Sequence, residues 1–243
     1  MALIYGINAV SEALKARRVS RLMHERGAGP RVDELVARAY ELRLGVETLD
    51  RRGMDKLARG GVHQGIAPEV QPLAAYTVEE LVEGASGPPL LVVLDGIEDP
   101  QNVGAILRSA DAAGADGVIR QARHAAPLDG ATAKASAGAV AHVRIATVVN
   151  ISRALDELKT LNVWTIGFDD QAADAYDEVD FTLPTALVFG AEGAGLRRLV
   201  RETCDRLVHI PMSGEISSLN VSVAAGIALF EARRQRRQRP PAV

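Results

Sequence analysis

Residues 89–119, "PLLVVLDGIEDPQNVGAILRSADAAGADGVI", have the pattern of a strand, a polar loop, a helix and a second strand. The continuous apolar run at 90–94 is typical of a strand that is buried on both faces of a sheet. Helical spacing follows over 102–113 and ends at Gly114, a residue type that commonly terminates helices. A strand, a crossover helix and another strand favour a mostly parallel sheet covered by helices.

The same alternation continues to the C-terminus and defines the expected domains. Further strands are predicted at 142–148, 163–168, 185–189 and 206–210, with helices between them and a long apolar helix at the end. Residues 1–75 also alternate between helical and strand patterns, which predicts a small α/β domain. Residues 76–88 are rich in Glu, Gly and Pro, so we expect a linker with at most a short helical turn. The second domain is expected to span 89–243.

Composition limits the class of protein. Hydrophobic residues make up 47% of the chain and charged residues 24%, as in ordinary globular proteins. The single cysteine, Cys204, excludes an internal disulfide, and no Cys/His spacing indicates zinc. No apolar run approaches the ~18 residues that span a membrane, and the N-terminus lacks the basic region of a secretory signal. We therefore expect a cytoplasmic protein with no membrane segment and no metal.

Charge is distributed unevenly along the chain. Residues 1–75 carry 12 Lys/Arg against 9 Asp/Glu, residues 89–230 carry 11 against 18, and the tail 231–243 carries 5 Arg and one Glu. A basic N-terminal domain and a basic tail permit a polyanionic partner, because Lys and Arg displace counterions from phosphates. Solvated charged faces and a solubilising tail are the alternative, which the pI of about 6.0 favours.

Three predicted strand ends carry unusual loops, and this grouping indicates the functional site. The loops are "LDGIEDPQNVG" at 94–104, "FGAEGAG" at 189–195 and "IPMSGEISSLN" at 210–220. Ligands of parallel α/β sheets bind at the carboxyl ends of the strands. The three loops are therefore expected to meet around one ligand.

The side chains in these loops suggest specific roles. Asn102 stands where a helix starts and is expected to cap it. Arg108, further along that helix, either extends into solvent or reaches back over the loop. Glu192 lies among glycines whose spacing does not match a dinucleotide fingerprint, and an acid there suits a hydroxyl, an amine or a cation rather than a phosphate. Ser218 is expected to be the N-cap of the last helix, which leaves Asn220 without a capping role.

Taken together, "DPQNVGAILRSADAAG", "LVFGAEGAGLRR" and "IPMSGEISSLNVSVAAGIALFEA" resemble the three signature motifs of the SpoU (TrmH-like) branch of the SPOUT RNA methyltransferases. The resemblance spans residues 90–235. In the N-terminal domain, "IYGINAVSEAL" and "VHQGIAPEV" are similar to the substrate-binding domain of the bacterial RlmB-type subgroup, which methylates a guanosine ribose in the peptidyl-transferase region of 23S rRNA.

The resemblance implies S-adenosylmethionine as methyl donor, a ribose 2'-O of 23S rRNA (free or in a pre-ribosomal particle) as acceptor, and a homodimer. It also implies a trefoil-knotted C-terminal domain, which periodicity alone would not predict. It gives Arg108 as the catalytic arginine, with Asn102, Glu192, Ser218 and Asn220 as polar partners. The cofactor is expected to contact Gly167, Gly190, Ile210, Met212 and Leu219.

The chemistry and the rival functions stay open at this point. Arg108 could act as a base or as a clamp that stabilises alkoxide charge, and no metal or cysteine is required. Related enzymes use the same motifs on tRNA or on other rRNA sites. A non-catalytic RNA-binding or ribosome-assembly protein is a second alternative, against which the intact polar set argues. A nicotinamide- or nucleotide-dependent enzyme is a third, against which the absence of G-x-G-x-x-G and P-loop patterns argues.

Overall fold

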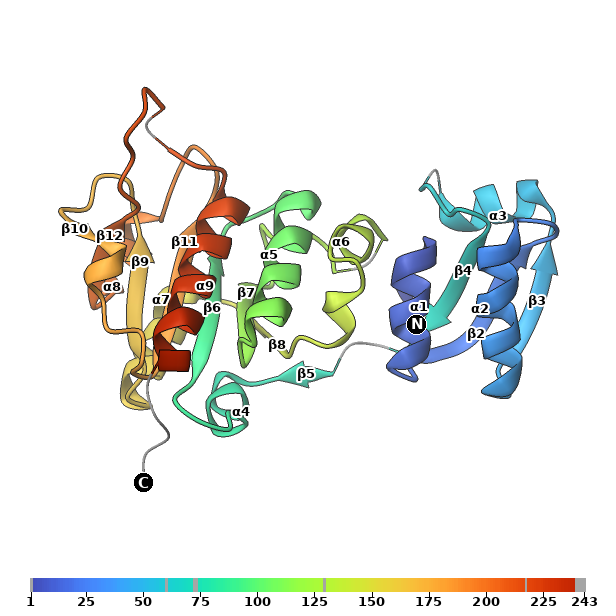
Figure 1. Cartoon of the computed structure of the whole chain (residues 1–243), viewed down its shortest axis with the longest axis horizontal. Helices are drawn as coiled ribbons and strands as arrows, with labels where there is room; N and C mark the ends of the chain where they lie inside the picture. Colours follow the sequence, from blue (N-terminus) through green and yellow to red (C-terminus); the bar gives the residue numbers. More distant parts are fainter. Residues whose placement is uncertain (1, 60, 72–73, 129, 217, 239–243) are drawn as a thin grey trace. The chain divides into compact units, whose positions relative to one another are not determined.

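The computed structural model describes residues 2–59, 61–71, 74–128, 130–216 and 218–238 (Figure 1). The chain forms two compact units. Unit 1 comprises Met1–Leu73, Val103–Arg108 and Pro127–His142, and unit 2 comprises Ala74–Asn102, Ser109–Ala126 and Val143–Val243. No helix of the described residues is both long enough and apolar enough to cross a membrane.

Unit 1 contains a four-stranded sheet in the order β1-β4-β2-β3. Its strands are β1 (Ala2–Leu3), β2 (Val19–Glu25), β3 (Gly45–Leu49) and β4 (Ile66–Val70). Strands β2 and β3 are parallel, whereas β4 is antiparallel to β2 and β1. The helices are α1 (Ile7–Lys15), α2 (Pro30–Glu41) and α3 (Arg51–Ala58). Apart from the short β1, these elements are those that periodicity predicted.

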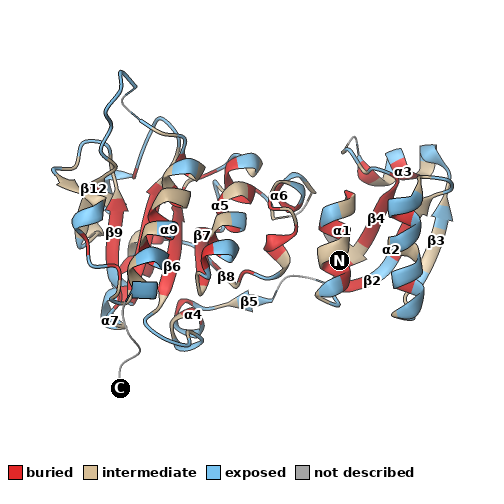
Figure 2. Ribbon diagram, in the orientation of Figure 1, coloured by how far each residue is buried: buried red, intermediate tan, exposed pale blue. Residues whose placement is uncertain are grey.

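Unit 2 contains an eight-stranded sheet in the order β10-β12-β9-β11-β6-β7-β8-β5, in which every recorded pairing is parallel. The strands are β5 (Ala75–Tyr76), β6 (Leu90–Asp95), β7 (Gly117–Gln121), β8 (Ile145–Val148), β9 (Trp164–Phe168), β10 (Asp174–Ala175), β11 (Thr185–Gly190) and β12 (Arg206–His209). All residues of β6 are buried, as its apolar sequence predicted. Figure 2 shows the central strands as the buried part of this sheet.

Helices cover both faces of this sheet. On one face, α4 (Val78–Glu83), α7 (Ile151–Thr160) and α8 (Arg198–Thr203) pack in one apolar cluster with Leu91 and Val93 of β6. On the other face, α5 (Pro100–Ala113) and α9 (Val221–Gln238) lie side by side (Figure 1). The Arg233 guanidinium of α9 donates to the carbonyl of Ala113 at 2.9 Å. Helix α6 (Gly130–Ala135) and two 3₁₀ turns, η1 (Ala139–Ala141) and η2 (Tyr176–Glu178), complete the chain.

Residues 76–88, for which a linker with a short helical turn was predicted, contain one short helix. The segment completes β5 and forms α4, and both Val78 and Leu81 are buried. Helix α4 begins with a capping box, in which Thr77 and Glu80 each accept a hydrogen bond from the other's backbone N–H. This T-x-x-E signal followed by apolar residues specifies a helix despite the high Glu and Gly content.

The last helix returns across the sheet. Strand β12 pairs with β9 on the side away from β11, yet α9 packs against β11, and Asn220 reaches Asn102 at the start of α5. The segment 210–220 therefore passes back over the carboxyl ends of the strands. This arrangement is the α/β trefoil-knot architecture of the SPOUT class that the resemblance implied, and it brings the three motif loops to one edge of the sheet.

Candidate active site

A cavity of about 530 Å³ opens at the carboxyl ends of β9, β11 and β12. Its walls come from the ends of these strands, the loop 190–195 and the returning segment 210–220. Seven of the ten expected site residues line it: Glu192, Ser218, Asn220, Gly190, Ile210, Met212 and Leu219. Residues of two of the three strand-end loops, 189–195 and 210–220, therefore line one ligand-sized space, and the loop 94–104 contributes none of the residues that line it.

The loop after β11 is a tight turn. Backbone hydrogen bonds of 3.1 and 2.8 Å join Ala191 and Gly195 in both directions. A Cβ at Gly190 would lie 2.1 Å from the carbonyl carbon of Gly195, so only glycine fits this position. The loop presents backbone groups to the cavity together with the exposed side chain of Glu192.

A buried carboxylate fixes the end of this loop. Asp95, the last residue of β6, is fully buried and accepts from Arg197 twice, from its backbone N at 2.9 Å and from its Nε at 2.7 Å. The Arg197 Nη2 also donates to Gln121 of β7 at 2.7 Å. An unpaired charge here would be strongly destabilising. Sequence reasoning missed this network, although an Asp that ends an otherwise apolar strand was a visible signal.

Asn102 links two of the motif loops. Its Nδ2 donates to Glu192 Oε2 at 3.1 Å, and its Oδ1 accepts from Asn220 Nδ2 at 2.9 Å. The expectation that Asn102 caps its helix was wrong. Asp99 is the N-cap and accepts from the backbone N of Gln101, while Pro100 occupies the first turn. Asn102 therefore stands inside the first turn, only 6% exposed, with its amide free to join the loops.

Asn220 holds the capping role that was assigned to Ser218. Its Oδ1 accepts from the backbone N of Ser222 at 2.9 Å and from the Ser222 hydroxyl at 2.6 Å. Its carbonyl accepts from the backbone N of Val223 and of Ala224. Ser218 lies before the helix and lines the cavity, and Ser217 lies outside the described residues. Asn220 thus caps α9 with one side-chain atom and binds Asn102 with the other.

Three expected residues do not line the cavity: Asn102, which reaches it only through its bonds to Glu192 and Asn220, and Arg108 and Gly167. Arg108 is exposed on α5, the helix that begins beside Asn102, and has no recorded hydrogen bond or ion pair with the described residues. Gly167 is buried in β9, where an added Cβ would lie 2.7 Å from the Leu207 side chain and 2.9 Å from the sulfur of Cys204. Close packing therefore explains glycine at 167, and its neighbour Phe168 is the residue that reaches the cavity.

Several cavity residues lay outside the predicted set. Asp169 pairs with Arg201 at 2.8 Å, and Asp170 lies beside it in the wall. Phe168 and Phe189 stack with ring centroids 4.7 Å apart. Cys204 lies close behind this wall, and burial, with a smaller contribution from Asp205, raises the pKa of its thiol to about 12. A cavity with apolar walls and several carboxylates suits an aromatic ligand that carries positive charge.

Sequence and structure comparisons place this site among known proteins. A family model described as the SpoU rRNA Methylase family matches residues 89–230, and one described as RNA 2'-O ribose methyltransferase substrate binding matches residues 3–76. A 23S rRNA (guanosine-2'-O-)-methyltransferase RlmB of Pseudomonas syringae pv. tomato is 45% identical over 96% of this chain and 95% of its own. The RlmB of Ralstonia nicotianae is 44% identical, covering 96% of each chain.

Solved structures agree over the whole chain. The SpoU methyltransferase AviRb from Streptomyces viridochromogenes, in complex with the cofactor AdoMet, is 29% identical and has a TM-score of 0.81 over 96% of this chain and 90% of its own. An AdoMet-bound rRNA methyltransferase from Sinorhizobium meliloti is 26% identical, with a TM-score of 0.74 over 96% of this chain and 87% of that one. With the three motif loops joined at one cavity, this chain belongs to the SpoU rRNA methylase family.

Proposed function

We propose that this protein transfers a methyl group from S-adenosylmethionine to the ribose 2'-O of a guanosine in 23S rRNA, in the peptidyl-transferase region. The observation that carries the proposal is the hydrogen-bonded chain Glu192–Asn102–Asn220 at the wall of a ligand-sized cavity. Family membership and the names of the RlmB relatives support the RNA substrate and the ribose acceptor.

The cavity fits S-adenosylmethionine on its own chemistry. Its volume lies within the range of cofactor sites, and its apolar walls suit an adenine ring. Glu192 and Asp170 provide negative charge for a ligand with a sulfonium and an ammonium group, whereas the charge of Asp169 is balanced by Arg201, which also lines the cavity. Backbone groups around Gly190, Ile210 and Leu219 would hold the cofactor, with Met212 against it. When bound, the cofactor supplies an activated methyl group.

The protein's part in the reaction is to orient a weak nucleophile and to stabilise the charge that it develops. Asn102 and Asn220 fix one another and Glu192, so three separate loops hold one geometry without further ordering. Ser218, exposed at the cavity, is placed to contact the ribose or the cofactor. Arg108 is exposed on α5, and a guanidinium can bind a phosphate through two parallel N–H donors. We therefore assign it the clamp role, on the phosphate next to the target ribose.

The proposal is tested with Arg108→Ala. The matched control is Arg153→Ala, which removes an exposed arginine from a different helix, α7. Arg108→Ala should reduce methyl transfer to 23S rRNA at least a hundredfold and leave S-adenosylmethionine binding by calorimetry unchanged; about 10²–10³ is typical for loss of one charge-stabilising group. Arg153→Ala should resemble wild type. Loss of cofactor binding with Arg108→Ala would assign Arg108 a structural role instead.

The choice of RNA is tested separately. Mapping alkali-resistant positions in RNA from a deletion strain, with and without the protein restored, should reveal one missing guanosine modification in 23S rRNA. A missing tRNA modification would overturn the rRNA assignment. Wild-type protein that binds rRNA but transfers no methyl group would favour a non-catalytic assembly factor.

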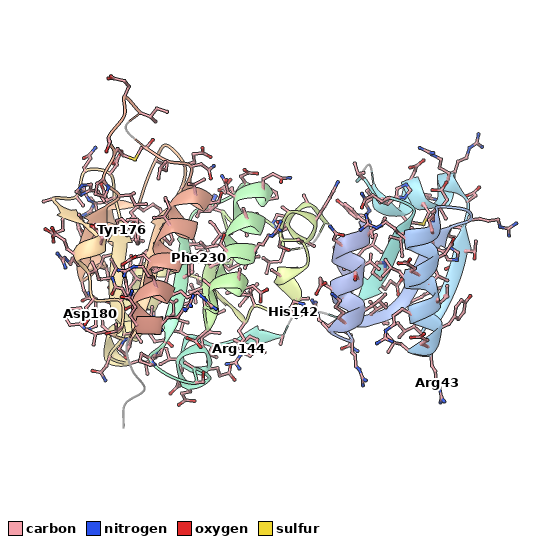
Figure 3. All side chains as sticks on the ribbon, in the orientation of Figure 1. Arg43, His142, Arg144, Tyr176, Asp180 and Phe230 are labelled. Atoms are coloured by element: carbon pink, nitrogen blue, oxygen red, sulfur yellow. The ribbon has the colours of Figure 1, made fainter. Side chains whose placement is uncertain are left out.

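We also propose a cytoplasmic homodimer. Helix α9 exposes Val223 and Phe230 at 49% and 50%, and because they are seven residues apart they lie on one face of the helix. Figure 3 labels Phe230 on this helix. An apolar stripe on a helix suits a second copy of the chain, as the family resemblance implied. Sedimentation equilibrium should give the mass of two chains, and a single-chain mass at micromolar concentration would contradict this assembly.

A further inference from the structure

Helix α3 in unit 1 separates apolar and basic residues sharply. Met54 and Ala58 are buried, whereas Arg51, Arg52 and Lys56 are exposed, as is Arg59 directly after the helix. At 3.6 residues per turn the three helical cations fall within an arc of about 140°, which also contains the exposed Asp55, and Arg59 follows the helix directly. We call this set, Arg51, Arg52, Lys56 and Arg59, the α3 basic face.

The carboxylates at the start of this helix and within it form hydrogen bonds inside unit 1, whereas its cationic side chains have no such partner among the described residues. The Asp50 carboxylate caps the helix by accepting from the backbone N of Gly53 at 2.8 Å. The Asp55 carboxylate bonds to Nε2 of His63 at 3.0 Å. No ion pair or hydrogen bond with the described residues is recorded for a side chain of the α3 basic face. Elsewhere in unit 1, Arg21 and Arg38 are paired with Glu47 and Glu41.

The segment that follows α3 is held by hydrogen bonds within unit 1. His63 Nδ1 accepts from the backbone N of Gly65 at 2.9 Å, and Gln64 Oε1 accepts from the backbone N of Ile7 at the start of α1 at 3.0 Å. The bond between Gln64 and Ile7 joins "VHQGIAPEV" to "IYGINAVSEAL", the two N-terminal segments that the sequence singled out. Arg59 has a left-handed backbone (φ 47°), which L side chains rarely adopt, so a basic side chain stands where glycine would be less strained.

We propose that the α3 basic face binds the sugar–phosphate backbone of the RNA substrate. Unpaired, exposed cations on a fixed helix can replace counterions along a phosphate chain, which provides affinity without reading the base sequence. The proposal rests on the proposed function for the identity of the RNA and adds the surface of unit 1 that holds it.

The test uses the full chain with Arg52→Gln and Lys56→Gln together. The matched control is Arg17→Gln with Arg43→Gln, which removes the same charge from two other exposed arginines of unit 1 with no recorded partner among the described residues; Arg43 lies just beyond α2 (Figure 3). Binding of unmodified 23S rRNA transcript is measured by filter binding from 0.05 to about 0.3 M salt, a range in which phosphate contacts dominate the salt dependence.

We expect the α3 variant to bind roughly tenfold more weakly near 0.15 M salt and to lower the slope of log K against log salt by about 1.4, the value for two single-strand phosphate contacts. KM for RNA should rise while kcat is unchanged. The control should stay within about twofold of wild type. Arg52→Lys with Lys56→Arg, which keeps both charges, should restore binding and exclude misfolding as the cause.

Equal losses in the α3 variant and the control would overturn the assignment, because they would show diffuse attraction to the whole unit. Unchanged RNA affinity in the α3 variant would overturn it as well. Neither result would contradict methyl transfer by the wild type. Conversely, a wild type that binds RNA with the predicted salt slope and transfers no methyl group would refute the proposed function and leave the surface assignment standing.

Discussion

Replacing Asn102 with aspartate should turn one hydrogen bond of the site into a repulsive contact, because the two side chains have nearly the same shape. The Asn102 Nδ2 now donates to Glu192 Oε2 at 3.1 Å, and its Oδ1 accepts from Asn220. In Asn102→Asp the bond from Asn220 survives, but two carboxylate oxygens face each other at the Glu192 contact. Repulsion therefore replaces attraction at a single atom pair.

The magnitude follows from the distance and the exposure. Two unit charges 3.1 Å apart repel by about 1.3 kcal/mol at the dielectric constant of water and by about 5 kcal/mol at an effective value of 20. Position 102 is 6% exposed but Glu192 is exposed, so we expect a loss of roughly 2 kcal/mol in the free energy of unfolding at pH 7. Displacement of the Glu192 loop should also weaken S-adenosylmethionine binding by about tenfold, equivalent to about 1.4 kcal/mol.

Repulsion raises the folded-state pKa of the carboxyl pair above the unfolded values of about 3.9 and 4.3. The folded variant then binds more protons than the unfolded chain, so its deficit relative to wild type is small below pH 4 and grows as the pH rises toward 7. Urea unfolding at several pH values measures this deficit, and calorimetry measures cofactor affinity.

The matched control is the double variant Asn102→Asp with Glu192→Gln. The amide introduced at position 192 can donate to the carboxylate introduced at position 102, so the bond is restored with donor and acceptor exchanged. Glu192→Gln alone should cost little. A double variant as unstable as Asn102→Asp alone would refute the reasoning, because it would show that the Asn102–Glu192 contact does not hold these loops together.

Two further predictions concern groups outside the catalytic set. Arg236 donates to the carbonyls of Pro88, Pro89, Phe181 and Leu183, so Arg236→Ala should lower the free energy of unfolding by about 2–3 kcal/mol. Arg237→Ala, which removes an exposed neighbour, should change the free energy of unfolding by less than about 0.5 kcal/mol. Equal effects of the two substitutions in urea unfolding would contradict a stabilising role for the carbonyl contacts of Arg236. Because burial raises the pKa of Cys204 to about 12, its thiol should stay neutral and react with iodoacetamide at pH 8 only after unfolding. Rapid labelling of the native protein would contradict this burial.

The C-terminal arginines differ in what they contact. The arginine-rich tail suggested an RNA contact or a solubilising end. Within the described residues, α9 continues to Gln238. Arg233 and Arg236 donate to backbone carbonyls, whereas Arg237 is exposed. Whether a cation meets a phosphate or a carbonyl depends on the elements that surround it, and those elements are distant in the chain.

Local interactions let the sequence determine the elements of this protein. Apolar runs of strand length, helical periodicity and glycine stops predicted the alternation of strands and helices in both units, because each signal acts within a few residues. The rule that ligands bind at the carboxyl ends of parallel strands then predicted that three loops form one site. Within the predicted linker 76–88, the capping box at Thr77 is the local signal that specifies the short helix α4.

Only the tertiary structure decided which polar side chains cap the helices and which join the loops of the site. Asn102 and Ser218 both looked like helix caps, since any short polar residue near a helix start fits that role, yet Asp99 and Asn220 are the caps. Asn102 and Glu192 are 90 residues apart, Asp95 and Arg197 are 102 apart, and Asn102 and Asn220 are 118 apart. The first two bonds exist because β11 pairs with β6, which brings the ends of these strands together. The third exists because the chain returns over the sheet from β12 to begin α9. Local periodicity does not predict the path of the chain between distant elements. The sequence therefore predicted which loops form the site, but not which of their side chains bind one another.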